Sequence, residues 1–175
     1  IIEPQVFGDV RGWFYESYSK QKMHDIGIDV EFVQDNRSFS AQQGTLRGLH
    51  CQTSPMAQTK LLTCLRGRIM DVAVDIRRGS PTYMQWTAVE LSGENKKMFF
   101  IPKGFAHGFA VLSETAVFQY KCDNFYHPEA DGGISILDDS LGIDWRIPTD
   151  HAILSEKDTR HPLLKDFESP FVYDK

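Results

Sequence analysis

The stretch GTLRGLHCQTSPMAQTK, residues 44–60, and the run LLTCLRGRIMDVAVDI, residues 61–76, decide the fold of this chain. We predict strands over residues 60–65 and 68–76, joined through Arg66-Gly67 as a β-hairpin. The second strand alternates in polarity, and one of its faces is an apolar stripe typical of a protein core, made by Met70, Val72, Val74 and Ile76. Its other face carries Asp71, Ala73 and Asp75.

Short strands separated by turns that contain Gly or Pro fill most of the remaining chain. We predict them over residues 13–18, 31–40, 83–91, 98–101 and 116–123. The only helix predicted covers residues 19–26, with Ser19 as its N-cap and Gly27 as its stop. This pattern favours an all-β sandwich or barrel. The 175 residues suffice for one well-buried domain and are few for two.

Composition restricts the possible partners and compartments. A net charge of −5 without clustered basic residues argues against a nucleic-acid-binding protein. No apolar run approaches the roughly 20 residues of a membrane span, and IIEPQVFGDVRG lacks the pattern of a signal peptide. The cysteines, Cys51, Cys64 and Cys122, are odd in number and form no CxxC pair, so we expect buried thiols and a cytoplasmic location. P-loop, GxGxxG and GxSxG motifs are absent, which leaves nucleotide hydrolysis, Rossmann redox chemistry and serine hydrolysis unsupported.

Lys60 begins a predicted strand in which neither face is polar, so we expect it to point away from bulk solvent. A cation there needs an anionic partner, either from the chain or from a ligand. His50 precedes it and can move a proton in the same cavity, although a histidine bonded to a backbone carbonyl is the commoner case. Gly48 permits a β-bulge, so Arg47 and His50 can converge despite their opposite strand parity. Arg47 is then either a solvated charge or a fork for a phosphate.

Two more side chains have open interpretations. Tyr120 shares an apolar strand face with Phe118, so it is a core residue or a proton donor, and the pattern favours the core. His107 lies between two glycines and can be a turn histidine, a metal ligand or a substrate contact. A metal site looks incomplete because residues 50–52 read His-Cys-Gln rather than HxH. Nothing local distinguishes Asp158 from a turn acid.

Seven segments in chain order carry a resemblance to a known family: FGDVRGWFYES, QDNRSFS, GTLRGLHCQ, QTKLLTCLRGRIMDVAVDIRRGSPTY, LSGEN, FIPKGFAHGF and YKCDNFYHPE. Over essentially its whole length the chain resembles the dTDP-4-dehydrorhamnose 3,5-epimerases. The resemblance implies an all-β, cupin-like jelly roll (double-stranded β-helix) with a few short helices and no metal or organic cofactor. It also implies a homodimer that exchanges N-terminal strands. The single domain, residues 1–175, then divides into an exchanging segment (1–40), a jelly-roll core (41–136) and a tail (137–175).

The resemblance assigns roles to individual residues. His50 is the general base, oriented by Asp158; Tyr120 donates a proton from the opposite face of the sugar; Lys60 stabilises the enolate oxygen at C4. The implied reaction epimerises dTDP-4-dehydro-6-deoxyglucose at C3 and C5. A 4-keto group acidifies both C–H bonds, so a weak base suffices beside a preorganised cation. The implied substrate contacts are Arg11, Phe14, Glu16, Gln34, Asn36, Ser38, Arg47, His107 and Tyr126.

Two positions depart from the family pattern. Cys51 stands where relatives often have an aromatic residue, and Leu137 stands where a tryptophan is common. These departures leave open epimerisation at C3 or C5 alone, or of another dTDP-4-keto-deoxysugar. A metal-dependent cupin enzyme that uses His50, His107 and an acid is a second hypothesis. A non-catalytic nucleotide-sugar binding module is a third.

Overall fold

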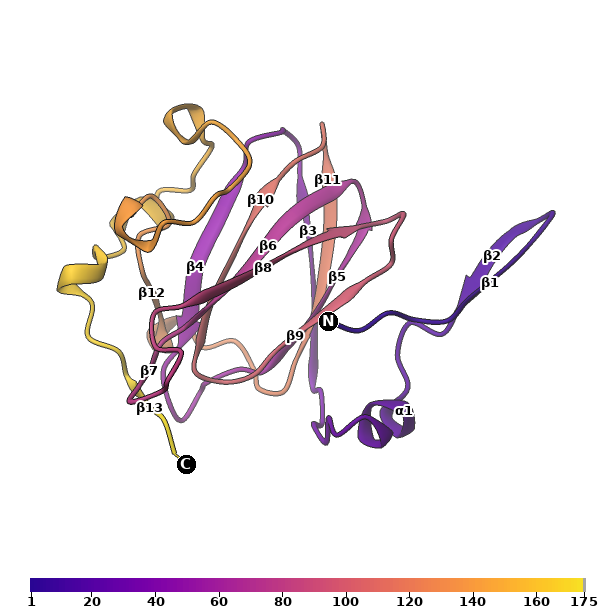
Figure 1. The fold of residues 1–175 in the computed structure, drawn as a ribbon, viewed down its shortest axis with the longest axis horizontal. Helices are drawn as coiled ribbons and strands as arrows, with labels where there is room; N and C mark the ends of the chain where they lie inside the picture. Colours follow the sequence, from indigo (N-terminus) through magenta and orange to yellow (C-terminus); the bar gives the residue numbers. More distant parts are fainter. Residues whose placement is uncertain (175) are drawn as a thin grey trace.

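The computed structural model describes residues 1–174, which form two antiparallel sheets packed face to face (Figure 1). The strand order is β12-β4-β10-β6-β8 in one sheet and β3-β11-β5-β9 in the other. Successive strands therefore alternate repeatedly between the sheets, as in a jelly roll. The predicted all-β jelly roll is confirmed. Its strands are β3 (Gln34–Ser40), β4 (Leu46–Gln52), β5 (Lys60–Arg66), β6 (Arg68–Asp75), β8 (Trp86–Ser92), β9 (Met98–Ile101), β10 (Phe105–Val111), β11 (Ala116–Cys122) and β12 (Asp131–Gly133).

The predicted hairpin at Arg66-Gly67 is wrong, because β5 and β6 belong to different sheets. Strand β5 pairs with β11 and β9, whereas β6 pairs with β10 and β8. Gly67 turns the chain with a φ of 79°, and a Cβ there would lie 2.1 Å from the carbonyl oxygen of Thr115. The tight turn thus carries the chain from one sheet to the other rather than back along the same sheet.

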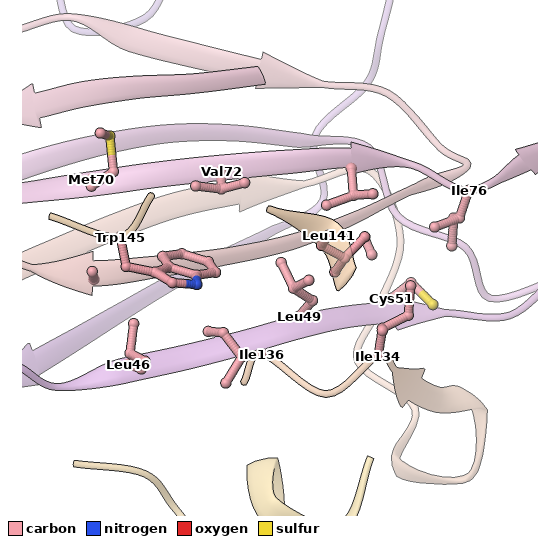
Figure 2. Close-up of a cluster of buried hydrophobic side chains, with 13 residues drawn as sticks. Leu46, Leu49, Cys51, Met70, Val72, Ile76, Ile134, Ile136, Leu141 and Trp145 are labelled. Atoms are coloured by element: carbon pink, nitrogen blue, oxygen red, sulfur yellow. The ribbon is translucent and has the colours of Figure 1, made fainter. Parts of the chain in front are cut away.

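The core has two main layers. Between the sheets pack Leu62, Cys64, Ile69, Ala73, Val89, Leu91, Phe99, Ile101, Phe109, Val111, Ala116 and Phe118. The predicted stripe of β6 is buried, but it packs on the outer face of the five-stranded sheet against Ile134, Ile136, Leu141 and Trp145 of the C-terminal segment (Figure 2). The opposite face of β6 is buried too, since Asp71 is 0% exposed and Ala73 joins the inter-sheet layer. Both faces of this strand therefore turn away from water.

The N-terminal part projects from this body. Strands β1 (Val6–Asp9) and β2 (Gly12–Tyr15) form a hairpin that extends away from the sandwich (Figure 1). The helix predicted over residues 19–26 is confirmed as α1 (Lys20–Asp25), with Ser19 Oγ accepting a hydrogen bond from the Lys22 backbone N–H. Within residues 1–174, no helix has both the length and the apolar character needed to cross a bilayer.

The C-terminal tail is irregular, as predicted. It contains short 3₁₀ turns and ends in β13 (Phe171–Val172), which pairs in parallel with β7 (Arg77–Arg78). The turns in the tail are Asp139–Leu141, Thr149–His151, Asp158–Arg160 and Leu164–Asp166, and one further 3₁₀ turn, Pro128–Ala130, precedes β12. Residue 175, the end of the predicted tail, lies outside the described residues. The tail matters for function because it places Asp158 against β4.

Candidate active site

A cavity of about 320 Å³ opens between the sheets, and both sheets line it. Strands β4 and β10 of the five-stranded sheet contribute His50 and His107. Strands β5 and β11 of the four-stranded sheet contribute Lys60 and Tyr120. The C-terminal segment adds Asp158. The volume of the cavity lies within the range of small-molecule sites, and its walls carry several ionisable groups.

His50 and Asp158 form a hydrogen-bonded pair. Nε2 of His50 lies 2.6 Å from Oδ1 of Asp158. The Ser155 hydroxyl donates to Oδ2 at 2.7 Å, and the Gly48 backbone N–H donates to Oδ1 at 3.4 Å. Burial by itself raises the pKa of Asp158, but these hydrogen bonds outweigh it and lower the pKa to about 2. The ionised carboxylate favours the tautomer that has its proton on Nε2, which leaves Nδ1 of His50 as a proton acceptor.

A bulge in β4 brings Arg47 and His50 to the same cavity. In the pairing with β10, His50 lies opposite His107 and Arg47 lies opposite Phe109, so a three-residue step faces a two-residue step. Gly48 occupies the bulge with a φ of 117°, and a Cβ there would lie 2.5 Å from the carbonyl oxygen of His107. The predicted convergence of Arg47 and His50 is confirmed, since both line the cavity.

Lys60 and Tyr120 line the wall that the four-stranded sheet provides. Lys60 is half-buried and lines the cavity, as predicted for a side chain that turns away from bulk solvent. Its removal from bulk water lowers the pKa of its ammonium. Its Nζ lies 5.8 Å from the centroid of the Tyr120 ring. Burial raises the pKa of Tyr120 to about 12, so the phenol keeps its proton at neutral pH. Tyr120 packs on Phe118, as expected of a core residue, and it also lines the cavity. Its role as a proton donor stays a prediction.

His107 lies within β10 rather than in a turn and is fixed by Asp71. Its Nε2 lies 3.0 Å from Asp71 Oδ1, and both side chains are buried. Burial lowers the pKa of His107 and raises that of Asp71, while the charge of Lys60 favours the ionised carboxylate. Within residues 1–174, the metal set of His50, His107 and an acid is not assembled; the cluster of potential ligands is instead His50, Asp158 and His161.

The sequence model of the family described as dTDP-4-dehydrorhamnose 3,5-epimerase matches residues 1–166. The chain belongs to this family. It is 53% identical over 161 residues to the dTDP-4-dehydrorhamnose 3,5-epimerase of Escherichia coli K12, covering 91% of this chain and 86% of the relative. A solved dTDP-6-deoxy-D-glucose-3,5-epimerase from Legionella pneumophila, in complex with dTDP-4-keto-L-rhamnose, superposes with a TM-score of 0.92 at 50% identity, covering 99% and 92% of the two chains. A 3'-monoepimerase from Streptomyces bikiniensis matches at 32% identity with a TM-score of 0.85, covering 94% and 82%.

Membership of the epimerase family confirms the resemblance that the sequence motifs carry. The predicted cupin-like jelly roll and isomerase class are confirmed with it. The structure brings all predicted catalytic residues and part of the predicted substrate contacts to one cavity: His50, Lys60, Tyr120, Asp158, Ser38, Arg47, His107 and Tyr126. Their individual roles in the reaction stay predictions.

The other predicted substrate contacts lie outside this cavity. Gln34 and Asn36 are not among the residues that line the cavity, but Gln34 accepts a hydrogen bond from the Tyr126 backbone N–H at 3.1 Å and donates one to Asn36. Gln34 therefore contacts the backbone of Tyr126 directly, and Asn36 contacts Gln34. Arg11, Phe14 and Glu16 lie on or just after the β1–β2 hairpin and are exposed. These three residues do not line the cavity that contains His50 of the same chain.

Several lining residues had not been singled out from the sequence: Gln52, Gln58, Phe109, Phe118, Asp131, Ser155 and Lys157. For two of them, the spacing in the sequence could have indicated a place in the site. Gln52 shares the strand face of His50, and Ser155 precedes Asp158 by three residues, a spacing typical of local side-chain-to-backbone hydrogen bonds. The Asp158 backbone N–H indeed donates to Ser155 Oγ at 3.2 Å. Of the two departures from the family pattern, Cys51 lines the cavity, whereas Leu137 borders a separate surface hollow.

Proposed function

We propose that this protein epimerises dTDP-4-dehydro-6-deoxy-D-glucose at C3 and C5 to give dTDP-4-dehydro-L-rhamnose. The observation that carries the proposal is the arrangement of the cavity: His50 lies on one sheet, while Tyr120 and Lys60 lie on the other. Inversion of a carbon needs a base on one face of the sugar and an acid on the other. The Legionella relative in complex with dTDP-4-keto-L-rhamnose supports this substrate class.

The reaction proceeds through an enolate. His50 removes the proton from the carbon next to the ketone, and ionised Asp158 stabilises the resulting imidazolium. The electron pair moves to the C4 oxygen, beside the ammonium of Lys60, whose charge is worth more in an enclosed site than in water. Tyr120 then delivers its proton to the other face of the carbon. Before the second epimerisation, His50 must lose a proton and the phenolate of Tyr120 must regain one.

The same cavity offers groups for binding. Arg47 carries a guanidinium fork suited to a diphosphate. Among the described residues, the Ser38 hydroxyl is buried without a hydrogen-bond partner, which favours a substrate atom as its partner. Tyr126 lies at the rim with an exposed ring suited to stacking on the thymine. No cofactor is needed for this chemistry, and the buried free thiols of Cys51, Cys64 and Cys122 suit the cytoplasm.

We further propose that the active form is a homodimer and that the β1–β2 hairpin completes the partner's site. The hairpin leaves large apolar side chains uncovered, including Trp13 at 62% and Phe14 at 69% exposure. Exposed apolar surface of this kind is typical of an interaction site. The hairpin also carries Arg11, which supplies a cation for the diphosphate if it reaches across the dimer.

Deuterium exchange followed by NMR tests the reaction. Incubated in D₂O with dTDP-4-dehydro-6-deoxyglucose, the protein is expected to incorporate deuterium at both C3 and C5. Exchange at one carbon only would show a monoepimerase instead. Tight binding without any exchange would favour the binding module, and activity that chelation removes together with a stoichiometric metal would favour the metal-dependent enzyme.

Subunit complementation tests the dimer. Arg11→Ala and His50→Ala are each expected to lower activity strongly when assayed alone. If the hairpin serves the partner's site, mixed dimers contain one site with both an intact His50 and an intact Arg11, so activity reappears on mixing. Activity that stays low after subunit exchange, verified by differently tagged chains, would contradict the crossed arrangement.

A further inference from the structure

His161, in the C-terminal segment, packs against His50. The two imidazole rings meet edge to face with their centroids 5.2 Å apart. Within residues 1–174, Nδ1 of His161 is buried and has no hydrogen-bond partner, which is costly for a polar atom. Among the same residues, the cavity lining includes His50 and Asp158 but not His161. His161 therefore has no role in the proposed epimerisation.

The three side chains have the composition of a metal site, and their ligand atoms lie close together. One nitrogen of each imidazole and one carboxylate oxygen of Asp158 lie within 4.8 Å of one another. A tetrahedral zinc ion with bonds of about 2.0–2.2 Å separates its ligand atoms by about 3.4 Å, so movements of roughly 1 Å bring these atoms into range. Two imidazoles and a carboxylate suit zinc and similar ions.

The surroundings already hold one ligand in place and leave a route inward. The Ser155 hydroxyl donates to Asp158 Oδ2 at 2.7 Å, as outer-shell groups do for carboxylates in metal sites. The His50 side chain is 29% exposed and borders the cavity, so an ion reaches the cluster without unfolding of the chain. The carboxylate supplies a negative charge that favours a cation there.

We propose that His50, Asp158 and His161 form a binding site for a divalent transition-metal ion of the zinc class, and that the bound ion inhibits the enzyme. The ion bonds to Nε2 of His50 and to Asp158 in place of the hydrogen bond between them. The proton of Nε2 then resides on Nδ1, so the base has no lone pair free for the substrate. The binding half of this proposal stands on the geometry alone. The inhibition half rests on the proposed function, in which His50 is the base.

Metal titrations without substrate test the site directly. The full chain, stripped of metal, is titrated with Zn²⁺ by calorimetry and with Co²⁺ by visible absorption. We expect one equivalent to bind and the Co²⁺ bands of a four- or five-coordinate site to develop. His161→Ala and His161→Phe remove the nitrogen ligand with different side-chain volumes, and each is expected to weaken binding by at least about tenfold, the lower bound for losing even an outer-shell partner.

His151→Ala is the matched control. His151 also lies beside an aspartate, Asp150, but its side chain is 85% exposed and does not belong to the cluster of potential ligands. It is expected to bind metal as the unchanged protein does. Equal affinity in the unchanged protein and both His161 variants would overturn the site, as would Co²⁺ spectra without such bands.

Activity assays separate the two halves of the proposal. Zn²⁺ is expected to inhibit the unchanged protein and EDTA to restore it, whereas His161→Ala keeps its basal turnover and resists Zn²⁺. A protein that binds Zn²⁺ through His161 and still epimerises at full rate would uphold the metal site and contradict the role of His50 as base.

Discussion

Nε2 of His50 and Oδ1 of Asp158 lie 2.6 Å apart although 108 residues separate them in the chain. Asp158→Asn keeps the side-chain shape but removes the charge that holds the His50 tautomer and stabilises the imidazolium. We expect kcat to fall by about 10²–10⁴-fold with little change in fold. Steady-state kinetics beside circular dichroism measures this. Asp150→Asn, at an exposed aspartate, is the control, and equal kcat values in the two variants would refute the pairing.

Lys60→Met tests the cation beside the enolate. The substitution keeps an unbranched apolar side chain in the cavity wall and removes the charge. We expect kcat to fall by about 10²–10³-fold, with a smaller change in KM, because the ammonium is needed most when negative charge develops on oxygen. Lys20→Met, at an exposed position in the first turn of α1, serves as the control. A rise in KM alone would make Lys60 a binding residue instead.

Tyr120→Phe separates deprotonation from inversion. The phenol, with a pKa raised to about 12 by burial, is protonated at neutral pH and able to donate. In the variant His50 still removes and returns a proton on its own face. We therefore expect solvent deuterium to enter the substrate while the inverted product is largely lost. Tyr83→Phe is the control, and inversion at an unchanged rate in Tyr120→Phe would exclude this tyrosine as the acid.

Asp75 is expected to make stability depend on pH. It is 1% exposed and accepts hydrogen bonds from Arg77, Ser80 and Thr82. Although burial opposes the effect, these bonds hold the pKa of Asp75 well below its usual value. A carboxyl whose folded pKa is lower than its unfolded pKa, about 3.9, stabilises the fold above that pH and loses this contribution as the pH falls further.

Asp75→Asn leaves the Arg77 guanidinium without its partner, so we expect the free energy of unfolding at pH 7 to fall by about 3 kcal/mol or more. The gap between the unfolding free energies of the variant and the unchanged protein should narrow as the pH falls below about 4, because there Asp75 takes up a proton in the unfolded chain before it does so in the folded protein. Urea unfolding at pH 7 and at a pH below about 4 measures this difference in unfolding free energy. Asp144→Asn, on the surface, is the control. A gap that stays constant with pH would refute an ionised Asp75 as its source.

Gly48→Ala tests the bulge that joins Arg47 to His50. At a φ of 117°, with His107 O 2.5 Å from the added Cβ, we expect both strain and a shift of β4. Activity should fall sharply, and thermal stability should fall by about 2 kcal/mol or more. Gly132→Ala lies in the neighbouring β12 with nothing within 4 Å of its Cβ and should be nearly neutral. Equal effects of the two substitutions would contradict this account.

Local patterns in the sequence were enough for much of the fold and part of the site. A short apolar run that ends before Pro102 predicted β9 at its observed bounds, and Ser19 with Gly27 delimited α1, because such runs and helix caps depend on neighbouring residues only. Gly48 predicted the bulge for the same reason. The motifs around His50, Lys60 and Tyr120 identified the family, and the structure gathers those side chains in one cavity.

The sequence by itself determined where strands form and which residues are chemically suited to the site, since both depend on residue type and short spacing. Only the tertiary structure decided that β5 and β6 join different sheets, that Asp71 holds His107, and that His161 packs on His50. Which strands pair depends on the total apolar surface that the complete sandwich buries. A turn such as Arg66-Gly67 is compatible with either outcome, and side chains more than 100 residues apart meet only once both sheets and the tail have packed.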